Sequence, residues 1–158
     1  MAKVLLGYYS RTGNTRKMAE IIKEGVAESG VDVVLKEVKD IKAEELLDYD
    51  GIVLGGPTYY GSMPGPLKEL LDKSVKYHGR LDGKVGGAFS SSANIGGGNE
   101  TTIMGIIQAL LIHGMIVQGD PSGDHYGPVS IGAPDKRVQD MCRRFGRRIG
   151  ELVKKLFG

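Results

Sequence analysis

Short apolar runs alternate with longer helix-like segments from one end of the chain to the other, and this alternation restricts the possible folds more than any other feature. Five runs have the length of strands: residues 3–9, 31–38, 51–55, 84–89 and 115–117. Four further segments are predicted to be helices: residues 16–29, 64–75, 100–113 and 135–157. Such alternation predicts βαβ units and a parallel sheet covered on both faces. We therefore expect a single, doubly wound, three-layer α/β domain spanning residues 1–158.

Ligands of doubly wound sheets bind at the carboxyl ends of the strands, so the loops that follow the strands carry the functional information. The loop after the first predicted strand leads directly into a helix and reads Ser10-Arg11-Thr12-Gly13-Asn14-Thr15. Unpaired N–H groups and the helix dipole favour an anion there, and the hydroxyl groups add donors. The loop lacks the Gly-Lys-Ser/Thr of a triphosphate loop and the three glycines of a dinucleotide loop. We predict a site for a phosphate monoester; a helix cap without a ligand is the alternative.

The loops after the third and fourth predicted strands have the composition of a binding site for a planar ring. The first reads Gly55-Gly56-Pro57-Thr58-Tyr59-Tyr60-Gly61-Ser62-Met63-Pro64. Its tyrosines either stack on an aromatic ligand or fold back as packing. The second reads Ser90-Ser91-Ser92-Ala93-Asn94-Ile95-Gly96-Gly97-Gly98-Asn99-Glu100-Thr101-Thr102. Its end is typical of a capped helix start, which favours a shaped loop over a plain linker.

The composition excludes several classes of protein. Hydrophobic residues make up 41% and charged residues 25% of the 158 residues, which is typical of a soluble globular domain. No apolar run approaches the roughly 20 residues of a membrane span, and we expect no signal peptide. The single cysteine, Cys142, rules out an intrachain disulfide and indicates a cytoplasmic location, with a packing role in its helix. A net charge of +2 gives no indication of nucleic-acid binding.

Taken together, the three loops and several further segments resemble the flavodoxin-like proteins that bind FMN, and more closely the WrbA family of NAD(P)H:quinone oxidoreductases. The segments that carry the resemblance are Tyr8-Tyr9-Ser10, Asp48-Tyr49-Asp50-Gly51-Ile52-Val53-Leu54-Gly55, Pro57-Thr58, Phe89-Ser90-Ser91, Gly96-Gly97-Gly98 and His113-Gly114-Met115. The resemblance implies a flavodoxin-like fold with a five-stranded parallel sheet in the order 2-1-3-4-5. It also implies FMN as the cofactor, NAD(P)H as the electron donor and a quinone as the acceptor.

The resemblance implies a set of cofactor-binding residues, most of them in the three loops. They are Ser10, Arg11, Thr12, Gly13, Asn14, Thr15, Pro57, Thr58, Tyr59, Tyr60, Gly61, Ser91, Ser92, Ala93, Asn94, Ile95, Gly96, Gly97, Gly98 and His113. For His113 the alternative is a histidine that only ends its helix. A substrate pocket is expected from Tyr77, His78, His125 and Tyr126. No catalytic side chain is required, because the flavin carries the chemistry, and no metal site is expected.

Two features differ from the family. The segment at residues 39–47 is short where the family has a longer insertion associated with tetramers, and no tryptophan is present to help form a substrate pocket. A homodimer or a homotetramer is therefore compatible with the sequence, and neither is favoured.

Three functions compete on this sequence. The first is a two-electron reductase that passes hydride from NAD(P)H through FMN to a quinone-like acceptor. The second is a flavodoxin-type one-electron carrier that docks on a redox protein; such carriers are usually acidic, whereas this chain has an isoelectric point of about 8.6. The third is a binding module without flavin, which leaves three ligand-shaped loops unexplained. The basic side of the last helix is interpreted as a solvated face.

Overall fold

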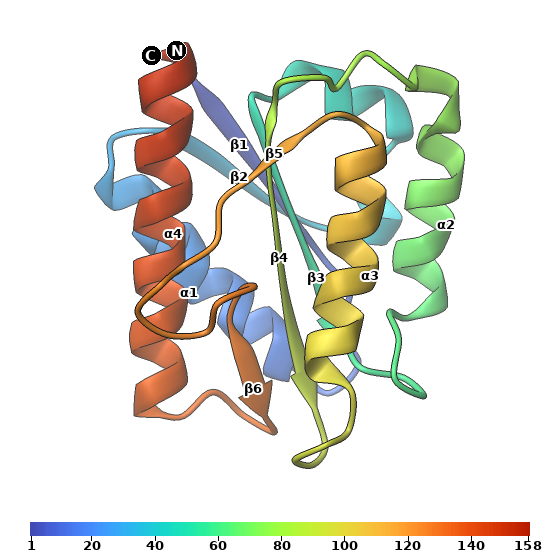
Figure 1. Ribbon diagram of the computed structural model, residues 1–158, viewed down its shortest axis with the longest axis vertical. Coiled ribbons are helices and arrows are strands. Elements are labelled where there is room, and N and C mark those ends of the chain that lie inside the picture. Colours follow the sequence, from blue (N-terminus) through green and yellow to red (C-terminus); the bar gives the residue numbers. More distant parts are fainter.

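The computed structural model describes residues 1–158 and contains one sheet between two layers of helices (Figure 1). The strands are β1 (Lys3–Tyr8), β2 (Asp32–Glu37), β3 (Gly51–Pro57), β4 (Val85–Ser92), β5 (Ile116–Val117) and β6 (Val129–Ile131). All pairings between them are parallel, and the order is β2-β1-β3-β4-β5, with β6 paired to β4. The predicted flavodoxin-like fold and its strand order are therefore confirmed, with one strand more than expected.

Four α-helices cover the two faces of the sheet. They are α1 (Asn14–Glu28), α2 (Gly65–Lys73), α3 (Asn99–Ile112) and α4 (Lys136–Phe157). Short 3₁₀ helices occur at η1 (Val38–Asp40), η2 (Ala43–Asp48) and η3 (Ser74–Tyr77). Because side chains alternate along a strand, Val4 and Leu6 of β1 enter the core under α1 and α4, whereas Leu5 enters the core under α2 and α3. Both faces are thus apolar, which is typical of a parallel sheet.

Helices α1 and α4 pack closely because glycines lie where they meet. A Cβ atom on Gly25 would lie 2.3 Å from the carbonyl oxygen of Arg143, and one on Gly146 would lie 2.2 Å from that of Ile22. The N-terminus of α4 is capped by Asp135, whose carboxylate accepts a hydrogen bond from the backbone N–H of Val138 at 2.9 Å. The high glycine content therefore serves helix packing as well as loops.

The β5 edge of the sheet differs from the prediction of a single strand at residues 115–117. Strand β5 has only two residues, beside the start of β4, and β6 pairs with the end of β4 through Ser90, Ser91 and Ser92. The residues between them form a loop that Asp120 fastens to α4 by two hydrogen bonds from Arg144, at 2.7 and 3.0 Å. One edge position of the sheet is thus filled by two short strands with a loop between them.

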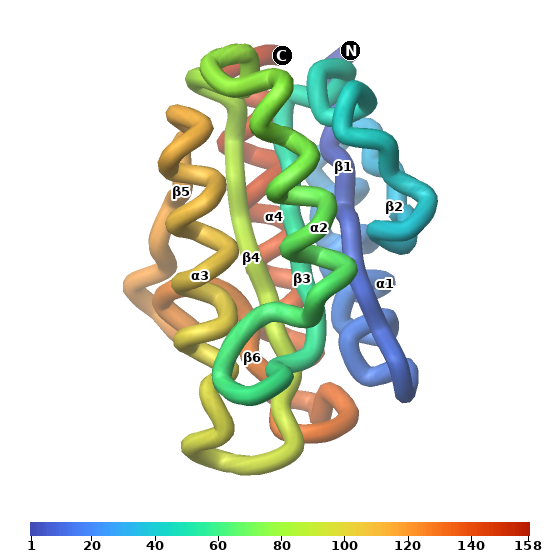
Figure 2. The backbone as a smooth tube through the Cα atoms, turned by 90° about the vertical axis from the view of Figure 1, so that its right-hand side faces the viewer, coloured from blue at the N-terminus to red at the C-terminus, as the bar shows by residue number.

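The predicted second helix is shorter than expected. Helix α2 ends at Lys73 and continues as η3, because the Ser74 hydroxyl donates to the carbonyl of Leu71 at 2.6 Å instead of leaving that carbonyl to a further helical turn. Helix α2 leads from the carboxyl edge of the sheet to its amino edge, as does α3 (Figure 2). No helix combines the length and apolar character needed to cross a membrane.

Candidate functional site

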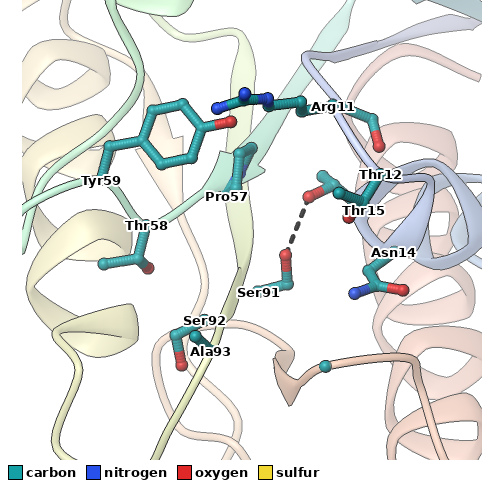
Figure 3. Close-up of a pocket in the computed structure, with 12 residues that line it drawn as sticks. Arg11, Thr12, Asn14, Thr15, Pro57, Thr58, Tyr59, Ser91, Ser92 and Ala93 are labelled. Atoms are coloured by element: carbon teal, nitrogen blue, oxygen red, sulfur yellow. Dashed lines mark hydrogen bonds between the residues drawn. The ribbon is translucent and has the colours of Figure 1, made fainter.

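A cleft of about 400 Å³ opens at the carboxyl edge of the sheet, where β1, β3 and β4 end (Figure 3). Its lining is drawn from the three loops that the sequence singled out, with one addition from the end of β6. The lining residues are Ser10, Arg11, Thr12, Asn14, Thr15, Pro57, Thr58, Tyr59, Ser91, Ser92, Ala93 and Gly132. The structure therefore brings the predicted phosphate loop, the aromatic loop and the end of β4 into one place.

The loop after β1 is closed by its own first hydroxyl group. The Ser10 Oγ accepts hydrogen bonds from the backbone N–H groups of Gly13 at 3.1 Å and Arg16 at 3.3 Å. Gly13 stands at the N-cap of α1 with φ of 100°, a left-handed conformation that favours glycine. The first intrahelical bond runs from Lys17 N–H to the Gly13 carbonyl at 3.0 Å. The loop is thus held as a turn by its own hydrogen bonds.

This turn leaves several backbone donors without acceptors. The N–H groups of Arg11 and Thr12 have no acceptor within the protein, and those of Asn14 and Thr15 precede the first intrahelical bond of α1. The cap position is occupied by Gly13, which has no side chain that could cap them. Free donors at the positive end of a helix dipole, facing a cleft, are suited to bind an anion.

Buried hydroxyl groups join the three strand ends beneath the cleft. The Thr15 Oγ1 and Ser91 Oγ atoms lie 2.9 Å apart and connect α1 to β4. The Thr58 Oγ1 lies 3.1 Å from both Ser90 Oγ and Thr102 Oγ1, which connects β3, β4 and α3. The floor of the cleft is therefore held by hydroxyl side chains from α1, α3, β4 and the loop after β3.

Tyr59 provides the aromatic wall of the cleft. Its ring meets the ring of Tyr9 edge to face, with centroids 6.3 Å apart, and the Arg11 guanidinium points toward its hydroxyl (Figure 3). Burial, with a smaller contribution from Tyr9, raises the pKa of the Tyr59 hydroxyl above its usual value. Tyr59 is therefore a neutral ring surface beside the anion-binding turn.

The next residues of that loop turn away from the cleft. The backbones of Tyr59 and Ser62 exchange hydrogen bonds of 2.9 and 3.1 Å, which forces Tyr60 to φ of 50° and Gly61 to φ of 76°. The Tyr60 side chain is fully exposed. Both residues were expected at the cofactor, and neither lines the cleft.

The loop after β4 divides into two parts. Ser92 and Ala93 line the cleft, whereas the residues from Asn94 to Gly98 project beyond it. Of these, Ile95, Gly96 and Gly98 border a separate hollow on the other side of the loop. Only the first part of this predicted set therefore lines the cleft.

His113 lies far from the cleft. It caps the C-terminal end of α3, whose 14 residues carry it about 20 Å along the helix from the loop that borders the site. There the ring is buried against Ser74, with His113 Nε2 2.8 Å from Ser74 Oγ, and it lines a second cavity. His113 therefore does not line the cleft, because α3 runs to the amino edge of the sheet, and its contact with the cofactor stays a prediction.

The predicted substrate-pocket residues also lie elsewhere. Tyr77 and His78 follow α2 at the amino edge, where His78 lines the same second cavity as His113. His125 and Tyr126 lie in the loop between β5 and β6, where the His125 Nδ1 is 2.7 Å from the Asp120 carbonyl oxygen. None of the four lines the cleft, so the expected pocket is not formed within one chain.

Gly132 is the lining residue that sequence reasoning missed. It follows β6, and its N–H donates to the Ser92 carbonyl at 2.8 Å, which places it at the cleft. The alternating segment Val129-Ser130-Ile131 was the available signal for this strand. It was hidden because a three-residue strand inside a glycine-rich segment resembles a loop.

Two further predictions concern reactive side chains outside the cleft. Cys142 is fully buried in α4, and burial raises the pKa of its thiol to about 12, which fits the predicted packing role. No group of three or more histidine, cysteine, aspartate or glutamate side chains could hold a metal ion.

A parallel doubly wound sheet with a turn of unpaired N–H donors after β1 and a tyrosine after β3 at one cleft is an arrangement suited to a phosphorylated aromatic ligand. The family described as Flavodoxin domain matches residues 5–96 of the chain. The protein therefore belongs to the flavodoxin family, and the family resemblance predicted from the sequence is confirmed.

The relatives carry two kinds of name. A protein named flavodoxin from Aquifex aeolicus is 41% identical over 162 aligned positions, covering 97% of this chain and 88% of the relative. A protein named NAD(P)H dehydrogenase (quinone) from Archaeoglobus fulgidus is 32% identical over 190 positions, covering 99% and 100%. The fold is also that of a solved WrbA-like flavodoxin structure from Agrobacterium tumefaciens, with a TM-score of 0.84, 23% identity and 99% coverage of both chains.

Proposed function

We propose that the cleft binds FMN and that the protein is an FMN-dependent oxidoreductase. The observation that carries this proposal is the pairing, in one cleft, of a turn with unpaired N–H donors and a tyrosine wall. A flavin mononucleotide has one terminal phosphate and one planar ring, so the residues present fit both of its ends. When bound, FMN supplies the electron-accepting and electron-donating ring.

Each side of the cleft has a part in this proposal. The N–H groups of Arg11, Thr12, Asn14 and Thr15 would hold the phosphate at the N-terminus of α1. Tyr59 would cover the ring and exclude water from one side. The groups around the cleft bind and orient the cofactor, and no side chain in it is arranged as a dedicated acid or base.

The proposed reaction is two-electron transfer from NAD(P)H to a quinone-like acceptor. It is supported by relatives named NAD(P)H dehydrogenase (quinone), which the chain matches over almost its whole length. A cytoplasmic location, and assembly into a homodimer or homotetramer, stay predictions.

A one-electron carrier is the second candidate, and the length of the alignments favours it. The alignment with the Archaeoglobus fulgidus protein spans 190 positions and the chain has 158 residues, so at least 32 positions have no counterpart. The alignment with the Aquifex aeolicus flavodoxin spans only 162 positions, at higher identity. A reductase could hold parts of its substrate site in positions that this chain lacks.

An anaerobic titration separates the two functions. FMN-loaded protein is mixed with NADH or NADPH, and the visible absorbance of the flavin is followed before and after a quinone is added. Rapid bleaching by a nicotinamide, reversed by the quinone, is the expected result for a reductase. No reaction with either nicotinamide, together with two separate one-electron steps on chemical reduction, would overturn that proposal in favour of the carrier. Failure to bind FMN at all would overturn both.

A further inference from the structure

Arg11 is the one charged residue in the lining of the cleft. The other eleven of the twelve lining residues are neutral, and no carboxylate is among them. A molecule in the cleft whose charge changes during a reaction would therefore interact with one side-chain charge of its lining, and that charge is positive.

The Arg11 side chain has no acidic partner within the protein. Arg16, at the start of α1, pairs with Glu20 at 3.1 Å, whereas Arg11 makes no ion pair. The guanidinium of Arg11 also does not turn back to its own loop. It extends away from Thr12 and toward the hydroxyl of Tyr59, on the other side of the cleft (Figure 3). An uncompensated positive charge thus lies at the aromatic wall.

The charge of Arg11 acts on this wall. Burial raises the pKa of the Tyr59 hydroxyl, Tyr9 adds to the rise, and the charge of Arg11 opposes it. Because salt screens exposed charges over about 8 Å, such an influence requires proximity. A ring covered by Tyr59 would therefore lie within reach of the same guanidinium.

The next step rests on the proposed function, in which the FMN ring beside Tyr59 takes up a hydride. A hydride carries two electrons and one proton, so the neutral ring gains one negative charge. The nicotinamide that gives up this hydride gains one positive charge, so atoms and charges balance. The phosphate at the other end of the cofactor has the same charge before and after. A cation beside the ring therefore favours the reduced cofactor over the oxidised one.

We propose that Arg11 sets the electron affinity of the bound cofactor: its guanidinium increases the affinity of the cleft for reduced FMN relative to oxidised FMN. The two parts of Arg11 then have separate roles, the backbone N–H toward the phosphate and the side chain toward the ring. Two unit charges about 10 Å apart near a protein surface change an equilibrium constant roughly tenfold. For a two-electron couple, a tenfold change corresponds to about 30 mV.

The reduction potential of the bound FMN tests the proposal. FMN-loaded wild type and Arg11→Gln are reduced anaerobically beside a reference dye, and the midpoint of two-electron reduction is read from the visible absorbance. Arg11→Gln keeps a polar side chain without the charge, and its potential should lie below that of the wild type by about 30 mV. Arg11→Lys keeps the charge and should retain most of the wild-type potential. An unchanged potential in Arg11→Gln would overturn the proposal.

The matched control is Arg16→Gln. It makes the same change in charge close by in the sequence, at a side chain that does not line the cleft and that pairs with Glu20. Its potential should differ from that of the wild type far less than the potential of Arg11→Gln does. An equal shift in both variants would show that net charge, and not the place of Arg11, is responsible, and would overturn the proposal.

The affinity for oxidised FMN, measured by quenching of flavin fluorescence, identifies the competing role, in which the guanidinium binds the phosphate. In that case Arg11→Gln would weaken the binding of oxidised and reduced FMN equally and leave the potential unchanged. That result would overturn the role at the ring and leave the FMN site intact. Wild-type protein that binds no FMN would instead overturn the proposed function itself.

Discussion

The two ends of α3 lie at opposite edges of the sheet and differ in how their polar groups are used. At the first end, the Thr101 hydroxyl donates to the Gly61 carbonyl at 2.7 Å and Thr102 contacts Thr58, so α3 braces the loops of the cleft. At the other end, the His113 side chain makes one hydrogen bond, to Ser74, and leaves its second nitrogen unpaired and buried. The first edge therefore presents many donors to one site, whereas the second keeps its unpaired nitrogen buried beside a largely apolar cavity.

This difference shows what each edge can bind. Donors from the backbone and the positive end of a helix dipole select an anion, and they act together because several lie around one turn. At the amino edge the unpaired imidazole nitrogen is covered, and the cavity beside it offers mainly aliphatic side chains. The same helix thus borders a site suited to a phosphate at one end and, at the other, a cavity whose two charged side chains pair with each other.

The largest expected effect is at the carboxyl edge. Thr12→Glu places a carboxylate beside the phosphate site, and like charges about 5 Å apart in a partly exposed site cost about 3 kcal/mol. We expect the Kd for FMN to rise about a hundredfold, measured by quenching of flavin fluorescence on binding. Thr12→Gln has nearly the same shape without the charge and should change the Kd far less. Equal FMN affinity in the Glu variant and the wild type would show that the phosphate does not bind at this turn.

The next effect concerns the buried floor of the cleft. Thr15→Val removes the hydrogen bond to Ser91 Oγ and leaves that hydroxyl without its partner, so the free energy of unfolding should fall by about 1–2 kcal/mol. Urea denaturation measures this change. Thr12→Val is the control, because Thr12 is exposed and makes no hydrogen bond, and its stability should stay within about 0.5 kcal/mol. A stable Thr15→Val variant would show that this contact does not brace the cleft.

Much of the carboxyl edge could be predicted because its signals are local in the sequence. A turn such as residues 10–15 directly follows its strand, and parallel strands bring their following loops to one edge. Eleven of the twelve lining residues come from the predicted loops, and those of the second and third loops lie in the parts nearest to the strands. Tyr60 and residues 94–98 were predicted to bind the cofactor but lie outside the cleft, because a loop tip can turn outward without any change in its composition.

The contacts at the amino edge could not be predicted, because they depend on residues far apart in the sequence. Whether His113 lies near the cleft depends on the direction and length of α3, which carries a residue at its C-terminus away from the edge where the helix begins. The hydrogen bond between Ser74 and His113 joins residues 39 positions apart, and no local sequence pattern predicts it. Strand β6 was not predicted for a related reason, since its formation depends on pairing with β4 and not on its own three residues.

The third expected effect is a pH dependence that arises at the amino edge. The folded-state pKa of His113 lies below the ordinary value of 6.5, so below pH 6.5 the unfolded chain binds a proton that the folded protein does not. Stability should therefore rise with pH up to about 6.5 and level off above it. Unfolding by urea at a series of pH values measures the slope.

His113→Gln should flatten this slope, and His125→Gln, which changes an exposed histidine in another loop, should not. Asp120 does not interfere, because its hydrogen bonds from Arg144 lower its pKa to about 2, and its contribution is lost only as the pH falls below 3.8. A slope between pH 5 and 6.5 that persists in His113→Gln would assign the titration to another group.

The smallest expected effect distinguishes an open cavity from a covered one. Val75→Ser shortens an aliphatic side chain that is 70% exposed. Because this side chain loses little contact with water on folding, the free energy of unfolding should change by no more than about 0.5 kcal/mol. FMN affinity should not change, because the substitution lies at the opposite edge of the sheet. A loss of more than about 1 kcal/mol would mean that Val75 is covered in solution, since only a buried side chain costs that much to truncate. The amino edge would then be an interface, and the contrast between a preformed anion site and an open apolar cavity would hold only for the isolated chain.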